Sequence, residues 1–369
     1  MKLAAIIFVA FTLFTHSAYA QELIQDTVTF VKAEVTEVVS AEERFVPATA
    51  ATSTYQTIKV KITEGEAIGQ TLTLDNDYLM LSKGESVYLR HTVNRVEGID
   101  TYAVSEPYRL PVLWFFVALF LACLFVFGGK QGIRGLLALI ASLFFISYLL
   151  LPGILSGYSP ILLSIAISSI IIVAGSYITH GFNRATTAAV IGMLITIVIT
   201  GVLAYIAIHW GRLSGYTDEE AVYLNFNTQG TIDFIGLLFG GLMIGLLGVL
   251  YDAAISQAIA VEELLSVGAG ISRKEVFSRG LRIGREHIGA LVNTLAIAYV
   301  GASLPLLLLF QQVASSHIAV SLNQELFATE ILRTAISSTG LILAVPITTL
   351  ISVWMLHGRP IKQRHTHHH

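Results

Sequence analysis

The apolar run FIGLLFGGLMIGLLGVLY, residues 234–251, continues into the more polar DAAISQAIAVEE, residues 252–263. This apolar run approaches the ~20 residues that a helix needs to cross a bilayer. It ends at Asp252, and an ionised carboxylate at membrane depth costs a few kcal/mol unless it faces a partner, an ion or water. Asp252 is therefore a candidate functional residue.

The composition of the whole chain is that of a protein with many membrane spans. Hydrophobic residues make up 54% of it, charged residues only 13%, and the mean hydropathy is +0.71. A soluble domain of this length does not have such a composition. The single cysteine, Cys123, excludes an intramolecular disulfide and a cysteine metal cluster within the chain.

The first part of the chain predicts an exported β domain. Residues 1–20 combine Lys2, an apolar core and a small-residue ending, which is typical of a cleavable signal peptide. Residues 21–109 hold 14 acidic and 8 basic residues and five short runs of alternating apolar and polar positions. Turn residues separate these runs, as strand pairing requires. We expect a small OB-like or SH3-like barrel or sandwich outside the cytoplasm.

Residues 110–357 predict an α-helical polytopic bundle of about seven transmembrane helices. The expected spans are 111–128, 135–152, 160–179, 187–209, 232–252, 287–311 and 331–356. With the β domain outside, the connections and tail on the cytoplasmic side carry eleven Lys or Arg residues, against Arg212 and Arg333 outside. This asymmetry indicates a cytoplasmic C-terminus, with residues 358–369 as a tail that ends in a His-rich tract.

Asp252 shares one predicted helical face with Gly241, Gly245, Gly248 and Ser256, at intervals of three or four residues. Small residues let a neighbouring helix approach closely, so we expect Asp252 to be buried in the bundle. The alternatives are a structural hydrogen-bonding role and a position at the membrane interface. Packing is also a simpler role for the glycines than lining a permeation path.

The sixth span offers a matching face that contains Gly289, Asn293 and Ala296. Asn293 or Thr294 is expected to hydrogen-bond Asp252, and Ser256 and Gln257 are expected to complete an ion, proton or solute site. Two prolines, Pro305 and Pro346, lie inside the sixth and seventh spans. They should kink those helices and free carbonyls that can line a cavity.

The basic loop that precedes the sixth span contains Arg273, Lys274 and Arg279. Membrane orientation alone explains its charge, although the loop could also dock a partner. Membrane lipid is an expected partner; we expect neither a nucleic acid, nor a cofactor, nor a bound metal.

The order of signal peptide, exported β domain and polytopic region resembles the YibE/F-like family of bacterial membrane proteins. The most specific stretches are GGLMIGLLGVLYDAAISQ, residues 240–257, and HIGALVNTLAIAYVGASLP, residues 287–305. The resemblance covers nearly the whole mature chain and implies a multi-pass protein of the bacterial plasma membrane. It implies no substrate and no catalytic residue.

Local chemistry does not favour an enzyme. The chain has no His-Glu-x-x-His, no Gly-x-Ser-x-Gly and no phosphate-binding Gly-x-x-x-x-Gly-Lys motif. The only other acidic residue in a predicted span is Asp233, about 28 Å from Asp252 along the helix, too far for a shared proton. Two functions remain: a permease or channel-like transporter with its site around Asp252, and a membrane-anchored binding module whose acidic β domain recognises a partner outside.

Overall fold

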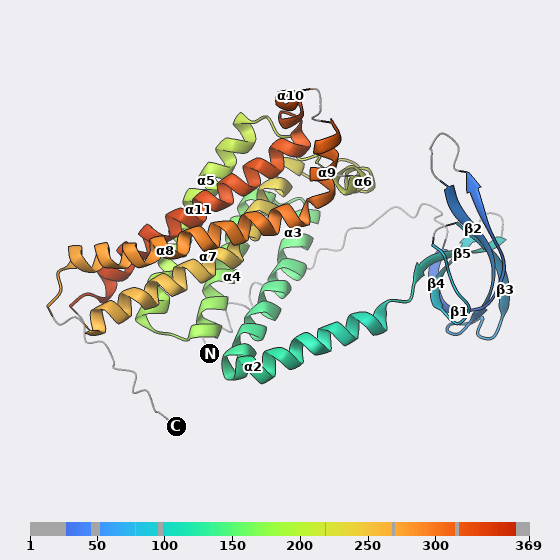
Figure 1. The fold of residues 1–369 in the computed structure, drawn as a ribbon, viewed down its shortest axis with the longest axis horizontal. Coiled ribbons are helices and arrows are strands. Elements are labelled where there is room, and N and C mark those ends of the chain that lie inside the picture. Colours follow the sequence, from blue (N-terminus) through green and yellow to red (C-terminus); the bar gives the residue numbers. More distant parts are fainter. Residues whose placement is uncertain are drawn as a thin grey trace. The chain divides into compact units, whose positions relative to one another are not determined.

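The computed structural model describes residues 27–45, 52–77, 79–94, 99–217, 219–267, 270–313 and 317–358. The predicted signal peptide and nearly all of the predicted tail lie outside these residues. The chain divides into two compact units, Met1–Ala122 and Cys123–His369, and each is described by itself (Figure 1).

The first unit is an antiparallel sheet of five strands, as the alternating sequence predicts. Its strand order is β3-β2-β1-β4-β5, so the long β1 pairs with both β2 and β4. Strands β3 and β5, at the two ends of this order, also contact each other. The strands are β1 Thr27–Phe45, β2 Thr52–Ile62, β3 Thr71–Asn76, β4 Ser86–Asn94 and β5 Ile99–Pro107.

The core of this unit is made by alternate residues of β1, β2 and β4. Val35, Ile58 and Leu89 are fully buried there, because side chains at every second strand position point to the same face. Two of the described buried residues in this unit, Gln56 and Asn76, are polar. The side-chain Oε1 of Gln56 accepts hydrogen bonds from Leu81 N at 2.7 Å and Asn76 Nδ2 at 3.1 Å, while its Nε2 donates to Leu81 O at 3.0 Å. Gln56 thus ties the loop after β3 to β2.

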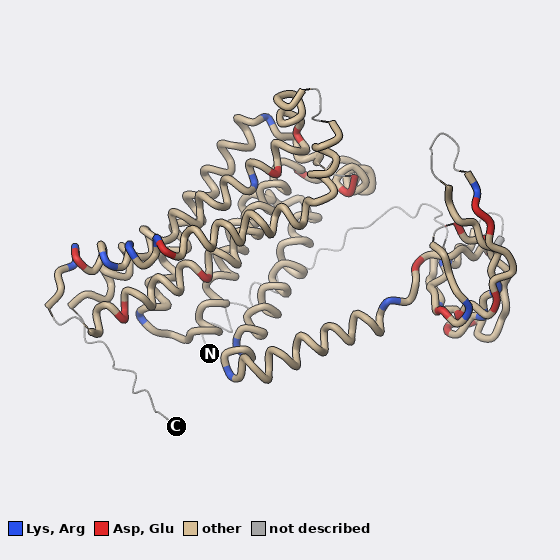
Figure 2. The backbone as a smooth tube through the Cα atoms, in the orientation of Figure 1, with Lys and Arg blue, Asp and Glu red and all other residues tan. Residues whose placement is uncertain are grey.

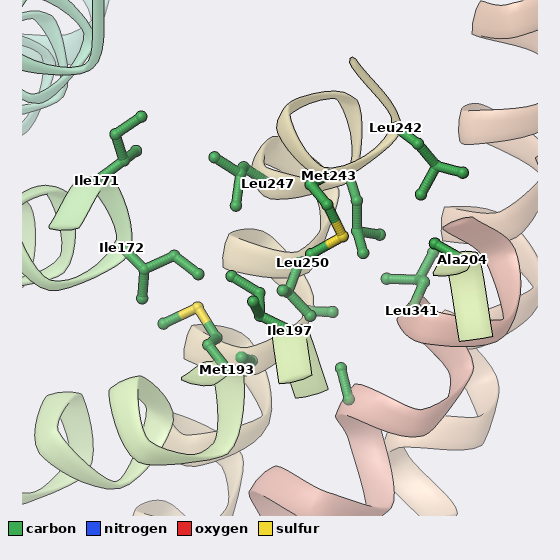
Figure 3. Close-up of a cluster of buried hydrophobic side chains, with 14 of the residues drawn as sticks. Ile171, Ile172, Met193, Ile197, Ala204, Leu242, Met243, Leu247, Leu250 and Leu341 are labelled. Atoms are coloured by element: carbon green, nitrogen blue, oxygen red, sulfur yellow. The ribbon is translucent and has the colours of Figure 1, made fainter. Parts of the chain in front are cut away.

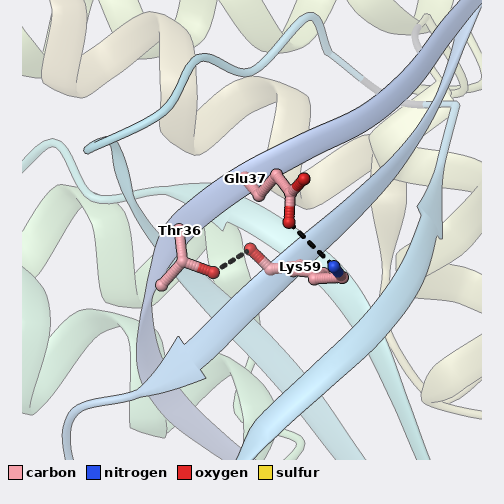
Figure 4. Close-up of polar contacts among 3 residues, drawn as sticks. All are labelled: Thr36, Glu37 and Lys59. Atoms are coloured by element: carbon pink, nitrogen blue, oxygen red, sulfur yellow. Dashed lines mark hydrogen bonds and ion pairs between the residues drawn. The ribbon is translucent and has the colours of Figure 1, made fainter.

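An irregularity in β1 brings a charged pair together on the outside of the sheet. The register with β2 shifts between Val35 and Glu37. Next to this shift, Thr36 Oγ1 donates to Lys59 O at 3.0 Å and Lys59 Nζ donates to Glu37 Oε2 at 2.8 Å (Figure 4). The hydrogen bond and the positive charge of Lys59 lower the pKa of the Glu37 carboxyl below its ordinary value.

Helices form the second unit and the end of the first. Among the described residues, five helical stretches are long and apolar enough to cross a membrane, or six if the bent pair α8 and α9 is one span. The first two expected spans lie within one such stretch, Leu110–Leu155, where the backbone leaves the helical conformation at Gly129 (φ 51°, ψ −138°). The elements are α2 Leu110–Phe145, η1 Ile146–Leu150, α3 Leu151–Leu155, α4 Pro160–His180, α5 Arg184–Trp210, α6 Glu219–Asn227, α7 Phe234–Val267, α8 Arg273–Ala302, α9 Leu304–Val313, α10 Ile318–Leu322 and α11 Glu325–Leu356.

Polar residues define where several of these helices begin. The side chain of Asn183 accepts a hydrogen bond from Thr186 N at the start of α5. Ser272 does the same for Glu275 N at the start of α8. Such caps satisfy backbone N–H groups that have no partner within the helix.

The core of the bundle lies where α11 packs against α5, α7 and α8, and α7 also packs against α4 and α5. Figure 3 shows part of it, where apolar side chains of α4, α5, α7 and α11 meet. In the same core, threonine hydroxyls of one helix pack against glycines of a neighbouring helix. A Cβ added at Gly192 would lie 2.5 Å from Thr348 Oγ1, and one at Gly340 would lie 2.5 Å from Thr200 Oγ1. Small residues therefore set how closely these helices approach.

Candidate functional site

The most deeply buried polar side chain of the predicted site is that of Gln257. It is 4% exposed, and its Nε2 donates to Gly280 O at 2.8 Å and to Thr349 Oγ1 at 2.7 Å. The Thr349 hydroxyl in turn donates to Val345 O at 2.6 Å. Gln257 thus joins α7, α8 and α11, whereas the sequence led us to expect it beside Asp252 in an ion, proton or solute site.

This junction exists because two glycines of α8 leave room for it. A Cβ at Gly284 would lie 2.3 Å from Val345 Cγ1 and 2.7 Å from Gln257 Oε1, and one at Gly280 would lie 3.1 Å from Thr349 Cγ2. Close approach brings the α8 backbone carbonyl within reach of a side chain of α7. These glycines lie four residues apart among the basic residues of α8, and they were not predicted from the sequence.

Asp252 lies elsewhere, and the prediction that it is buried in the bundle is wrong. Its side chain is exposed on α7. The neighbouring charged group that acts on it is His180, the last residue of α4. Tyr251 lies between these helices, with its hydroxyl donating to Gly175 O at 3.3 Å and its ring 5.9 Å from that of His180. Asp252 therefore faces the C-terminal end of α4.

The expected partners of Asp252 on α8 do not meet it. Asn293 and Thr294 are both exposed, and the Thr294 hydroxyl donates to Ala290 O of its own helix at 2.9 Å. Ser256 is exposed as well. The error has a physical cause, because helical periodicity shows which residues share a face but not which face a neighbour covers.

The predicted glycine face of α7 exists, but the described residues leave most of it uncovered. Gly241, Gly245 and Gly248 are exposed together with Asp252. A Cβ at Gly241 or Gly248 would meet nothing within 4 Å among the described residues, and the same holds for Gly289 on α8. Gly245 differs, because a Cβ there would lie 2.8 Å from the Tyr299 hydroxyl of α8.

A second polar group lies where α8 ends and α9 begins. The two helices are bent by 73°, and Pro305, which follows the break, agrees with the predicted kink. At the break, Ser303 Oγ donates to Glu330 Oε2 at 3.1 Å, and Glu330 Oε1 lies 2.7 Å from Arg333 Nη1. Pro346 lies inside α11, which is one helix from Glu325 to Leu356; a kink there stays a prediction.

The ion pair at this break is partly buried. The side chains of Glu330 and Arg333 are 22% and 28% exposed, and Arg333 Nε has no hydrogen-bond partner within the described part of the chain. The predicted seventh span began at residue 331 and so excluded Glu330. The sequence does carry one sign of this ion pair. The Glu-x-x-Arg spacing places the side chains of Glu330 and Arg333 on one helical face.

Tyr299 connects the break to the glycine face. Its hydroxyl lies 3.4 Å from Ser337 Oγ of α11, at a hydrogen-bonding distance, and close to Gly245 of α7. A line of polar and small residues thus runs from Ser303 and Tyr299, near the end of α8, to Gly245 of α7. It continues along α7 through Gly248 to Asp252. We call this line the α7–α8 track.

Arg273, Lys274 and Arg279 were expected in a loop, which is wrong, because they lie on the first turns of α8, where all three are exposed. Arg279 pairs with Glu275 at 2.6 Å. Among the described residues, no group of three or more His, Cys, Asp or Glu side chains could hold a metal ion.

The long apolar helices and the partly buried charges define a polytopic membrane protein with an N-terminal β domain. The family model of the YibE/F-like protein matches residues 116–358, so the chain belongs to this family. Searches of curated proteins and of solved structures find no match to it.

Proposed function

We propose that the chain is a permease or channel-like transporter of an ion or small solute in a bacterial plasma membrane. In this proposal it spans the membrane seven times, with the β domain outside and the C-terminus in the cytoplasm. The helical stretch Leu110–Leu155 breaks at Gly129 into residues 110–128 and 130–155. Each part is long enough to cross the membrane, so this stretch contributes two of the seven proposed spans. With the bent pair α8–α9 as one span, the total is seven.

The charges of the helical unit support this orientation. Figure 2 shows Lys and Arg residues of the first half of α8 at one end of the bundle. Cations next to spanning helices gather on the cytoplasmic side. The break between α8 and α9 lies at the other end of α8, so the Glu330–Arg333 pair would lie in the outer half of the membrane.

The observation that carries the proposal is the broken span facing an ion pair. Charges inside membrane proteins are costly and mark substrate or ion pathways. Transporters build their sites at discontinuous helices, whose free backbone groups and nearby side chains contact the solute. We place the outer binding site at Ser303, Glu330 and Arg333, and the inner end of the path at Asp252, with the α7–α8 track between them. No catalytic step is part of this proposal.

A second function, recognition of an extracytoplasmic partner, is favoured by one feature of the β domain. Since β3 and β5 contact each other, the strand order closes into the circle 1-2-3-5-4, the arrangement of an OB-fold barrel. Such barrels bind ligands on the face of strands 2 and 3. A partner that co-purifies only when residues 21–109 are present would support this function over transport.

The test is flux in proteoliposomes loaded with a panel of pH- and ion-sensitive dyes. We expect flux in the wild type and its loss in Glu330→Gln and in Asp252→Asn, because each removes one charge of the path with little change of size. The exposed Glu263, beyond the track, provides the matched control Glu263→Gln, which should keep flux. Wild-type flux in folded Glu330→Gln, judged by gel filtration, would contradict the assignment of the outer site.

A further inference from the structure

The short helix α6 connects two spanning helices. It lies between the end of α5 at Trp210 and the start of α7 at Phe234. In Figure 1 it is seen end-on, whereas α7, α8 and α11 are seen along their length, so it runs across the bundle. A connection between the ends of two spans lies at a membrane surface. Since α6 also crosses the direction of the spans, it would run along that surface.

Several contacts hold α6 and its preceding loop on the bundle. Ala221 is buried, and Leu224 packs against the core. Before α6, the backbone N–H groups of Ser214 and Gly215 donate to Glu325 Oε1 at 2.6 and 2.9 Å. These contacts fix which side of α6 faces the bundle.

The opposite side of α6 is apolar, aromatic and open. Val222 is 58% exposed, Tyr223 71% and Phe226 84%, and these three side chains line a shallow hollow together with Glu219. Trp210, at the end of α5, is 86% exposed. Aromatic rings gather at the level of lipid headgroups, where one part of the ring is apolar and the other can reach water.

We propose that α6 is an interfacial helix whose open face inserts into the lipid surface and contacts phospholipids that carry an ammonium headgroup. The carboxylate of Glu219 lies at one end of this face and attracts an ammonium group, while the rings of Tyr223 and Phe226 offer cation–π contacts. Helices that bind anionic lipids carry Lys or Arg on the polar face. Residues 219–227 contain neither. The inference rests on the membrane topology proposed above and not on the transported solute.

Lipid contact can be tested with the full-length protein in nanodiscs. In a Cys123→Ala background, a fluorophore is attached to Phe226→Cys, or to Val222→Cys in a second variant. Gln229→Cys, an exposed site beyond α6, is the control. We expect quenching of the first two labels by headgroup-nitroxide lipid and their protection from iodide, with the reverse at residue 229. Equal iodide quenching at all three sites would overturn the proposal, as would protection from both quenchers, which would mean that protein covers the face.

Headgroup selection is tested by comparing nitroxide lipids with ethanolamine and glycerol headgroups in the same nanodiscs. We expect quenching at residue 222, where the label replaces neither ring, to favour the ethanolamine lipid by about two- to fivefold, the ratio that one exposed ion pair supplies. Glu219→Gln should remove this preference. Glu220→Gln removes the same charge from a neighbouring position that does not line the hollow, and should keep it. Loss in both variants, or no preference in the parent protein, would overturn the assignment of Glu219.

Discussion

In the part of the chain that the structure describes, each unit has one deeply buried glutamine, and the two are held differently. Gln56 in the β domain bonds the backbone of Leu81 and the side chain of Asn76, so it fastens a loop to a sheet. Gln257 in the bundle bonds a carbonyl of α8 and a hydroxyl of α11, so it fastens three helices to one another. The hydrogen bonds of Gln56 lie beside an apolar core, whereas those of Gln257 lie next to glycines of α8.

The two glutamines differ in this way because the β domain folds in water and the bundle folds in lipid. In water, burial of Val35, Ile58 and Leu89 drives the sheet together, and Gln56 specifies how the loop attaches. In lipid, apolar side chains gain little by leaving an apolar solvent, so close packing of small residues and hydrogen bonds between helices must hold the bundle. Loss of a glycine should therefore harm the bundle more than loss of the glutamine.

The largest effect is expected at Gly284. Gly284→Ala places a methyl group 2.3 Å from Val345 Cγ1 and should lower the free energy of unfolding by about 2–3 kcal/mol or more, because neighbouring helices must move apart. Gly289→Ala, on the same helix with nothing within 4 Å among the described residues, should be neutral or slightly stabilising. Thermal unfolding of both variants in detergent measures this. Equal midpoints would show that the tight contact does not hold the bundle.

An intermediate effect is expected at the two glutamines, and it compares the solvents directly. Gln56→Leu removes the side chain that bonds the buried backbone N–H and C=O of Leu81, which should cost about 1–3 kcal/mol. Gln257→Leu should cost about 0.6–1.7 kcal/mol, the range found for hydrogen bonds between membrane helices. Hydrogen exchange of the full-length protein in nanodiscs, read over each unit, measures both. A larger loss for Gln257→Leu would reverse the ranking of hydrogen bonds between the two solvents.

The smallest effect is expected at the exposed pair of Glu37 and Lys59. Lys59 lowers the pKa of folded Glu37, so the pair stabilises the β domain above the ordinary carboxyl value of 4.5 and stops doing so as the pH falls through the folded pKa. Lys59→Ala should lower the midpoint of the β domain slightly near neutral pH and leave it unchanged well below pH 4.5. High salt should also abolish the difference. A difference that persists in acid would mean that packing of the Lys59 stem, not its charge, is responsible.

The β domain was well predicted because its signals are local. Alternation along β1, β2 and β4 places Val35, Ile58 and Leu89 on one face whatever the rest of the chain does. The buried role of Gln56 was not visible, since its partners come from the loop after β3.

The candidate site in the bundle was predicted only in part. Pro305 was expected at a kink, where the span breaks, but the burial of Gln257 between three helices was not predicted. Asp252 was expected to meet Asn293, but it lies beside His180 instead. The pairing of Glu330 with Ser303 joins residues of two helices and has no signal in the sequence of either one.

What the sequence by itself determined is the membrane class, the five strands, the positions of most long helices and the residues that share the face of α7 with Asp252. These follow from local chemistry: the length of an apolar run, the period of a strand or a helix, and the conformation of glycine and proline. The tertiary structure alone decided which helix faces are covered, that Gln257 joins three helices, and that an ion pair lies at the break after α8. Those depend on how closely helices far apart in the chain approach one another. In lipid, that approach is set by the shapes of the meeting faces, because apolarity is the same on all sides of the helix.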